Sequence, residues 1–216
     1  MMPDTPFVPS HPEATDTPVR LAVLVSGGGT NLQALLDAQA NGVLTSGRVS
    51  LVVSDKPSAY ALTRARQAGI PALTVDKKAL GSQAAFEEAL LSLLQEHRIQ
   101  VILLAGFLSI LSPAFVARYP RRILNVHPSL IPSFCGEGFY GLRVHEAALA
   151  RGVRLTGATV HFVNEIPDGG EIIAQQAVPV LSGDTPELLQ QRVMREAEWV
   201  LFPRAAEQVC RELLTH

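Results

Sequence analysis

The sequence predicts a doubly wound α/β fold, in which a mostly parallel sheet is extended by an antiparallel hairpin near the C-terminus. Short apolar runs rich in β-branched residues alternate with segments of helical periodicity over residues 20–127. This alternation is typical of parallel strands joined by right-handed crossovers. Two longer strand-like runs then follow each other over residues 156–180, with an Asp-Gly-Gly turn signal between them.

The first repeats of strand and helix are read from buried runs and the glycines that follow them. Residues 20–26, RLAVLVS, form a continuous apolar run ending in glycines, and the helical spacing of residues 30–42 also ends at a glycine. A second strand is expected at 48–55, a second helix at 59–69 and a short third strand at 71–76. Continuous rather than alternating apolar residues indicate strands that are covered on both faces.

The next units carry stronger helix signals. Residues 82–98 are amphipathic, with an apolar stripe along one face and most of the acidic and amide side chains off it. In the helix predicted at 112–119, Ser112 suits the N-cap, and a proline follows at the first helical position. Buried strands are predicted on either side of this helix, at 99–106 and 122–127.

The last third of the chain changes character. A helix is expected at 140–152, followed by two strands at 156–165 and 171–180 that pair as an antiparallel hairpin. One long helix over residues 185–214, bent near Pro203, closes the chain. Repeats, low-complexity segments and linkers are not evident, so we expect one domain over residues 19–216, preceded by a flexible Pro-rich tail over residues 1–18.

The composition is that of a globular chain without a bias towards charged partners. The 216 residues are 47% hydrophobic and 18% charged, with a formal net charge of −2. Such a balance gives no support for nucleic-acid or membrane binding, so any anionic ligand must be held by local groups. Cys135 and Cys210 form neither a disulfide framework nor a metal-binding pair, and a reducing cytoplasm is the simplest compartment.

The turn SGGGTN at residues 26–31 joins the first strand to the first helix. Free backbone N–H groups and the helix dipole make such a turn an anion site. A dinucleotide fingerprint would begin Gly27, Gly29 and need a third glycine where Leu32 stands, so the turn suits a single phosphate better than a pyrophosphate. The alternative is a tight turn that binds no ligand.

The strand at 122–127 carries Asn125 and His127, two positions apart and therefore on one face. An amide and an imidazole there can stabilise an oxyanion, and the imidazole can also transfer a proton. A nearby carboxylate would favour the protonated ring. Asp168 is the candidate for that carboxylate, with Asp55 and Asp184 as weaker rivals. The alternative is that His127 only ends the strand.

Other polar residues are interpreted structurally. His145 and His161 are not spaced as metal ligands, and we expect no metal site. Cys135 has no obvious base beside it. Arg64 and Arg66 are interpreted as a solvated helix face rather than as an anion clamp.

Several motifs occur in this order and at these spacings: LVSGGGTNLQALLDA, LAGFLSILSPAFV, LNVHPSLIPSF, TGATVHFV and DGG. With them the chain resembles the phosphoribosylglycinamide formyltransferases, folate-dependent enzymes of de novo purine synthesis, from about Leu21 to Pro203. The N-x-H-P-S-L motif is shared by the wider formyltransferase superfamily, whereas the glycine turn is specific to enzymes that act on glycinamide ribonucleotide. The resemblance implies the formyltransferase fold.

The resemblance also implies a reaction, its substrates and a role for each matched position. The formyl group of 10-formyltetrahydrofolate would pass to the amine of glycinamide ribonucleotide, in a monomer or homodimer without metal. The catalytic residues implied are Asn125, His127 and Asp168. The substrate-binding residues implied are Gly29, Thr30, Asn31 and Glu198, the last of these near the ribose. The cofactor-binding residues implied are Gln83, Leu108, Ser109, Ile110, Leu111, Asn125 and Asn164.

Some positions depart from the family pattern. Ser109 and Gln83 stand where basic residues are common, which weakens the expected grip on the folate carboxylates. Trp199 replaces a usual histidine, and the loop SFCGEG at residues 133–138 is longer than the common form. The rival functions are a formyltetrahydrofolate deformylase, in which water is the acceptor, and a nucleotide-binding protein without catalytic activity or an NAD-dependent oxidoreductase.

Overall fold

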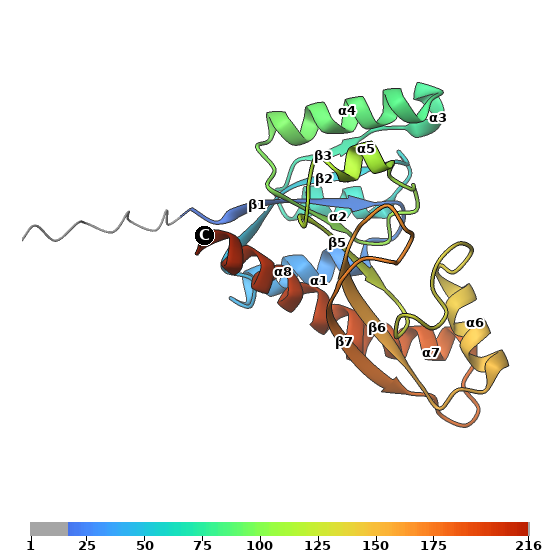
Figure 1. The fold of residues 1–216 in the computed structure, drawn as a ribbon. Helices are drawn as coiled ribbons and strands as arrows, with labels where there is room; N and C mark the ends of the chain where they lie inside the picture. The colour runs from blue at the N-terminus through green and yellow to red at the C-terminus, as the bar shows by residue number, and fades with distance from the viewer. Residues whose placement is uncertain (1–16, 216) are drawn as a thin grey trace, which may run out of the picture.

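A computed structural model describes residues 17–215, which form one sheet covered by helices on both faces (Figure 1). The predicted tail lies, up to residue 16, outside the described residues, and the first strand begins at Val19. The strands are β1 (Val19–Val25), β2 (Gly47–Ser54), β3 (Ala72–Thr74), β4 (Val101–Leu104), β5 (Ile123–His127), β6 (Leu155–Phe162) and β7 (Ile172–Pro179). The helices are α1 (Thr30–Ala40), α2 (Tyr60–Gln67), α3 (Lys77–Leu80), α4 (Gln83–Glu96), α5 (Pro113–Val116), α6 (Leu142–Arg151), α7 (Pro186–Val193), the π-helical η1 (Met194–Glu198) and α8 (Trp199–Leu214).

The strand order confirms the predicted doubly wound topology. The sheet has 7 strands in the order β3-β2-β1-β4-β5-β6-β7. The first five of these strands are parallel, and β6 and β7 add to the edge in antiparallel pairing. The chain runs outward from β1 to β3 and then returns to place β4 beside β1. A crevice for ligands is therefore expected beyond the carboxyl ends of β1 and β4.

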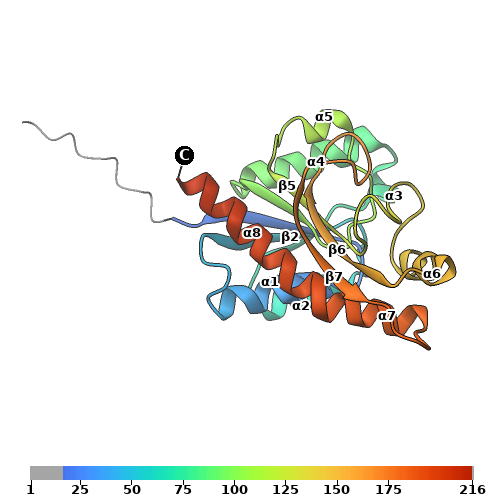
Figure 2. The same ribbon diagram turned by 60° about the horizontal axis from the view of Figure 1, so that its bottom comes forward.

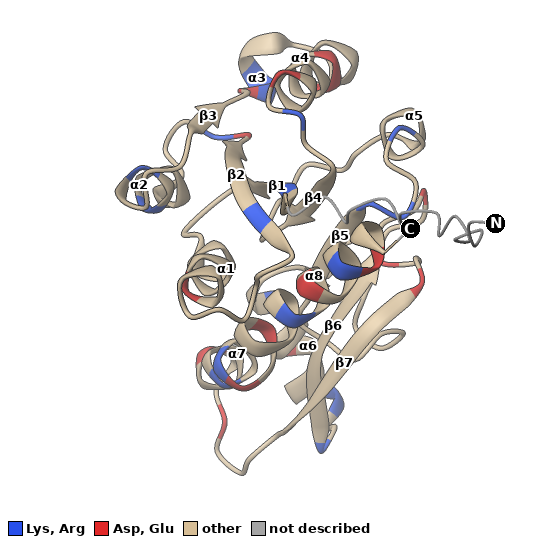
Figure 3. Cartoon of the chain, turned by 90° about the vertical axis from the view of Figure 1, so that its left-hand side faces the viewer, with Lys and Arg blue, Asp and Glu red and all other residues tan. Residues whose placement is uncertain are grey.

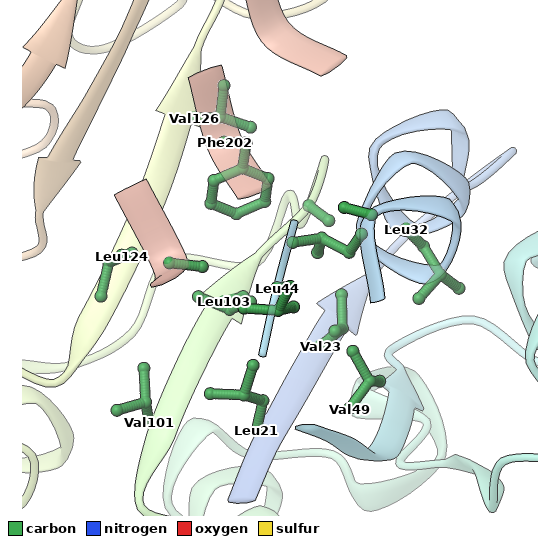
Figure 4. Close-up of a cluster of buried hydrophobic side chains, with 14 of the residues drawn as sticks. Leu21, Val23, Leu32, Leu44, Val49, Val101, Leu103, Leu124, Val126 and Phe202 are labelled. Carbon is green, nitrogen blue, oxygen red and sulfur yellow. The ribbon is translucent and has the colours of Figure 1, made fainter. Parts of the chain in front are cut away.

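Each face of the sheet has its own hydrophobic core. On one face, Leu103 and Leu124 pack with side chains of α1, α2 and α8, including Phe202 (Figure 4). Figure 2 shows α8 lying across this face of the sheet, beside α1. On the other face, Ile102 and Ile123 pack with residues of α4 and α5. Alternate residues of one strand therefore enter different cores, which explains why the parallel strands read as continuous apolar runs.

The one-turn helix α3 was not predicted. The side chain of Asp76 accepts hydrogen bonds from the backbone N–H groups of Lys78, at 2.9 Å, and Ala79, at 3.3 Å. Gly81 ends the helix in the left-handed conformation. Local capping thus produces a helix too short to show hydrophobic periodicity.

The C-terminal helix contains a π-helical segment that the sequence did not predict. Pro203 lies inside α8, and the irregularity is the π-helical segment η1 immediately before that helix. Proline lacks an N–H group, and its ring crowds the carbonyl of the residue four positions earlier. The wider π turn lies just N-terminal to that carbonyl and carries Glu198 in a buried position. π turns of this kind are frequent at functional sites.

Among residues 17–215, no helix combines the length and the apolar character needed to cross a membrane. Acidic and basic residues occur together on several of the helices (Figure 3).

Candidate active site

β5 places Asn125 and His127 on the face of the sheet opposite to α8. Leu124 and Val126 enter the core under α8, and Ile123 enters the core under α4 and α5. Asn125 and His127 continue the face of Ile123 towards the carboxyl end of the strand. There they contact strand β6 and the loops that follow β5 and β6. The polar pair thus lies at the edge where a parallel sheet binds its ligands.

The carboxylate of Asp168 joins these two side chains. Its Oδ2 lies 3.5 Å from His127 Nδ1, and its Oδ1 accepts a hydrogen bond from Asn125 Nδ2 at 3.4 Å. The rival carboxylates are engaged elsewhere: Asp55 accepts from the hydroxyl of Ser109 at 2.7 Å, and Asp184 pairs with Arg192. Asp168 is therefore the carboxylate that meets the Asn125–His127 pair.

Asp168 is held in an unusual backbone conformation. Its φ is +55°, in the left-handed region that non-glycine residues seldom adopt. Gly170 follows shortly after, and a Cβ there would lie 1.7 Å from the carbonyl oxygen of Phe162. The chain therefore passes so close to the end of β6 that only glycine fits. The turn aims the Asp168 carboxylate inward.

His161 belongs to the same cluster, although the sequence did not single it out for catalysis. It pairs directly with Asn125 across the β5–β6 ladder, and its Nε2 lies 3.2 Å from Asn125 Nδ2 and 3.5 Å from Asp168 Oδ1. Its Nδ1 lies 2.8 Å from the carbonyl oxygen of Phe162. The sequence shows the alternation within each strand, but the register between the strands is a tertiary property.

Burial and the neighbouring polar groups shift the pKa of Asp168 in opposite directions. Burial raises its pKa, but the hydrogen bond from His161, the charge of His127 and the N–H group of Gly136 together bring it below its ordinary value. The carboxylate is therefore ionised at neutral pH. His127 Nε2 lies 2.9 Å from the carbonyl oxygen of Phe134, so a protonated ring can donate on both sides.

The loop SFCGEG, which remained unexplained in the sequence, supports this cluster. Phe134 offers its carbonyl oxygen to His127, and the N–H group of Gly136 donates to Asp168 Oδ2 at 2.9 Å. Cys135 lies between these two residues in the sequence. Burial and the charge of Asp168 raise the pKa of its thiol. A raised pKa disfavours the thiolate, which fits the interpretation of Cys135 as a loop residue and not a nucleophile.

The glycine turn follows β1, which lies two strands away from β5 along the same edge of the sheet. Gly29 has a φ of +74°, and a Cβ at this position would lie 2.6 Å from the Cβ of Ala61 in α2. At Gly27 and Gly28 an added Cβ would meet nothing within 4 Å. Within residues 27–29 of this turn, the packing of the protein thus requires glycine only at position 29. No side chain caps α1, so its first N–H groups remain available to a ligand.

Glu198 is brought to this turn by the π segment. Asn31 Nδ2 donates to Glu198 Oε2 at 2.6 Å, and the Thr30 hydroxyl faces the sulfur of Met194 at 3.9 Å. Burial raises the pKa of Glu198 to about 7, although the hydrogen bond from Asn31 lowers it in part. Among the described residues, Asn31 Oδ1 is buried without a hydrogen-bond partner.

The residues implied for cofactor binding line two adjoining cavities. The smaller one, of about 130 Å³, has walls from the loops after β4 and β6, and its polar end is formed by Asn125, His161 and Asp168. Its lining includes Leu108, Ser109, Ile110, Leu111, Asn125 and Asn164. Gln83 lines the larger cavity, of about 770 Å³, and Leu108 and Ser109 line both. Gln83 itself donates to the Ile110 carbonyl at 3.0 Å.

A third hollow of about 410 Å³ lies between α1 and α8. Trp199, Pro203 and Thr30 contribute to its walls, whereas the Asn125–His127–Asp168 cluster does not. Within residues 17–215, no group of three or more His, Cys, Asp or Glu side chains is arranged to hold a metal ion.

Comparison with known proteins decides the family. The model of the formyl transferase family matches residues 19–205. The chain belongs to the formyl transferase family. This confirms the resemblance seen in the sequence motifs.

Formyl transferases with similar sequences occur in larger proteins and as shorter enzymes. The chain is 46% identical over 191 residues to the trifunctional purine biosynthetic protein adenosine-3 of Gallus gallus, covering 88% of this chain and 18% of the relative. It is 41% identical to the chloroplastic phosphoribosylglycinamide formyltransferase of Arabidopsis thaliana, covering 89% of this chain and 66% of that protein. The chain therefore spans less than a fifth of the avian protein and about two thirds of the plant protein.

Solved structures of formyl transferases match over almost the full length. Glycinamide ribonucleotide transformylase 1 from Symbiobacterium toebii superposes with a TM-score of 0.84 at 44% identity, covering 90% of this chain and 89% of that one. A formyltetrahydrofolate deformylase from Pseudomonas syringae gives a TM-score of 0.79 at 27% identity, covering 92% of this chain and 63% of that one. The fold is thus common to both enzymes, and the sequence is more similar to the transformylase.

The raised pKa of Glu198 predicts a pH-dependent stability. Between its ordinary value of 4.5 and about 7, the folded protein keeps a proton that the unfolded chain has released. The free energy of unfolding should therefore fall as the pH rises through this range, and Glu198→Gln should make that fall smaller. Urea unfolding at several pH values measures the effect.

Glu196→Gln is the matched control, because Glu196 is exposed on the same segment. An unchanged pH dependence in Glu198→Gln would show that Glu198 ionises normally.

Proposed function

We propose that this chain transfers the formyl group of 10-formyltetrahydrofolate to the amine of glycinamide ribonucleotide, giving formylglycinamide ribonucleotide and tetrahydrofolate in de novo purine synthesis. The observation that carries the proposal is the Asn125–His127 pair held by Asp168 at the ligand-binding edge of the sheet. The names of the similar transformylases support the choice of substrates.

The reaction needs stabilisation of an oxyanion and movement of a proton. The substrate amine attacks the formyl carbon, a C–N bond forms, and the carbonyl oxygen becomes negatively charged. Asn125 Nδ2 donates to Asp168 in the structure, and the His127 ring faces both Asp168 and the Phe134 carbonyl. We infer that the oxyanion takes the place of one of these acceptors at each side chain, while Asp168 favours the charged ring. The amine proton passes to N10 of the folate, the bond from N10 to the formyl carbon breaks, and tetrahydrofolate leaves.

Binding of glycinamide ribonucleotide requires a site for its phosphate and one for its ribose. The N–H groups at the start of α1, with the side chains of Thr30 and Asn31, suit the phosphate because they combine donors with the positive end of a helix dipole. The open space at Gly27 and Gly28 supports this role, since the packing of the protein does not require glycine there. Glu198 can accept hydrogen bonds from the ribose hydroxyls.

The smaller cavity suits the pterin end of the folate. Apolar side chains such as Phe107 and Val163 form its walls, and it opens on Asn125 and Asp168, so a ring bound there would direct its formyl group to the reaction centre. Asn164 shapes the loop over this cavity, because it donates to the Gly169 carbonyl at 3.2 Å and accepts from Ile166 N–H at 2.9 Å.

The deformylase is the second candidate, because it shares the fold. The glycine turn and Glu198 argue against it, since water as the acceptor needs neither a phosphate nor a ribose site. A cytoplasmic location and a monomeric or homodimeric state remain predictions, as does the absence of nucleic-acid and membrane partners.

Turnover with each acceptor separates the two candidates. The protein is mixed with 10-formyltetrahydrofolate, with and without glycinamide ribonucleotide, and tetrahydrofolate production is followed. We expect turnover only when the amine is present. Equal turnover without the amine would identify a deformylase, and no turnover with it would contradict the proposed activity.

His127→Ala should lower kcat by about 10²–10³, because removal of one oxyanion donor typically costs that much. The variant should still fold, which circular dichroism measures. His97→Ala, at the end of α4, is the matched control and should retain the wild-type rate. A near-normal rate for His127→Ala would exclude this residue from the chemical step.

The larger cavity suits the anionic glutamate tail of the folate. It adjoins the smaller cavity through Leu108 and Ser109. Its walls carry three lysines, at positions 56, 77 and 78, against two aspartates, at positions 55 and 76. Two of these lysines lie on α3, where Figure 3 shows positive charge beside the start of α4. Positions 83 and 109 lack the basic side chains that are common in the family. The nearby lysines can supply positive charge in their place.

Replacing both lysines of α3, Lys77→Gln with Lys78→Gln, should raise the KM for 10-formyltetrahydrofolate by roughly two- to fivefold, as expected for exposed charge pairs. The increase should be larger for a substrate with several glutamates and smaller at high salt. Arg118→Gln, which removes an exposed charge elsewhere, is the control. An equal change for short and long glutamate tails would contradict this placement of the tail.

A further inference from the structure

Two carbonyl groups of the glycine turn accept hydrogen bonds from helix α2. The N–H group of Ala61 donates to the Gly27 oxygen at 3.0 Å, and Arg64 Nε donates to the Gly28 oxygen at 2.8 Å. Two consecutive carbonyls of the turn therefore point towards α2.

The planarity of the peptide bond fixes the direction of the N–H groups in the turn. In a trans peptide, the N–H group of each residue points away from the preceding carbonyl. With the carbonyls of Gly27 and Gly28 directed to α2, the N–H groups of Gly28 and Gly29 are directed away from it. If either peptide plane rotated, a carbonyl oxygen would replace an N–H group on the surface that an anion meets.

Arg64 is itself held from several sides. Its Nη1 donates to Gln33 Oε1 in the first turns of α1 at 3.1 Å, and its guanidinium lies 5.1 Å from the ring centre of Tyr60. Gln33 is fixed in turn by a hydrogen bond to Asp37 at 2.9 Å. One guanidinium thus links α2, the turn and α1, which the planar, multiply donating group of arginine permits and a lysine does not.

We propose that Arg64 is a positioning residue for the phosphate of the substrate, which keeps the Gly28 and Gly29 N–H groups of the turn directed at that phosphate. The inference rests on the proposed function, because it assumes that the turn binds a phosphate. It corrects the interpretation of Arg64 as part of a solvated helix face, whereas Arg66, exposed on the same helix, fits that description.

The test compares Arg64→Met with Arg64→Lys and with the control Arg66→Met, in steady-state kinetics with both substrates varied. For Arg64→Met we expect the KM for glycinamide ribonucleotide to rise about tenfold, the size expected for loss of one charged hydrogen bond. The kcat and the KM for 10-formyltetrahydrofolate should stay within about twofold, because the folate cavities do not include this residue. Arg64→Lys should be intermediate, and Arg66→Met should match the wild type.

Three results would overturn the inference. One is an Arg64→Met variant with the same KM for glycinamide ribonucleotide as Arg66→Met. Another is a similar rise in the KM of both substrates with a lowered melting temperature, which would indicate a merely structural role. If Arg64→Met does not fold, Arg64→Lys decides, and a wild-type KM in that variant would also overturn it. Failure of the proposed function is distinguishable, because the wild-type protein would then show no turnover that depends on glycinamide ribonucleotide.

Discussion

The site depends on the contacts of the half-buried Asp168 carboxylate. This carboxylate meets the ends of β5 and β6, through His127 and His161, and the backbone of the loop at Gly136. An ionised carboxylate inside a protein is tolerated only when several donors surround it. That requirement fixes the relative positions of three segments far apart in the sequence, and the same contacts keep Asn125 in place beside His127.

The other half of the site depends on backbone geometry rather than on charge. Gly29 allows α2 to approach the turn, and the contacts from Ala61 and Arg64 orient its peptide groups. The π segment before α8 brings Glu198 to Asn31. Both halves occupy the carboxyl edge of one sheet. The strand order reverses between β1 and β4; the glycine turn follows β1, and β5 lies beside β4. A substrate with a phosphate at one end and an amine at the other matches this division.

Much of the fold and some of the site could be predicted from local patterns. Short-range periodicity predicts the buried strands, the amphipathic helices and the pairing of β6 with β7. The structure confirmed these predictions. His161 was missed because its partnership with Asn125 depends on the register of two strands. Arg64 was misread because periodicity places a side chain on a helix face but does not reveal the turn that packs against it.

The sequence by itself determined the doubly wound sheet, the side-by-side placement of Asn125 and His127, and the family. The shared face of Asn125 and His127 follows from covalent spacing, since residues two apart on a strand must lie on one face. Only the tertiary structure decided which carboxylate meets that pair, what the SFCGEG loop contacts, and where the C-terminal helix turns π-helical. Such features arise from contacts between distant segments, and their free energies depend on burial and register, which no local pattern encodes.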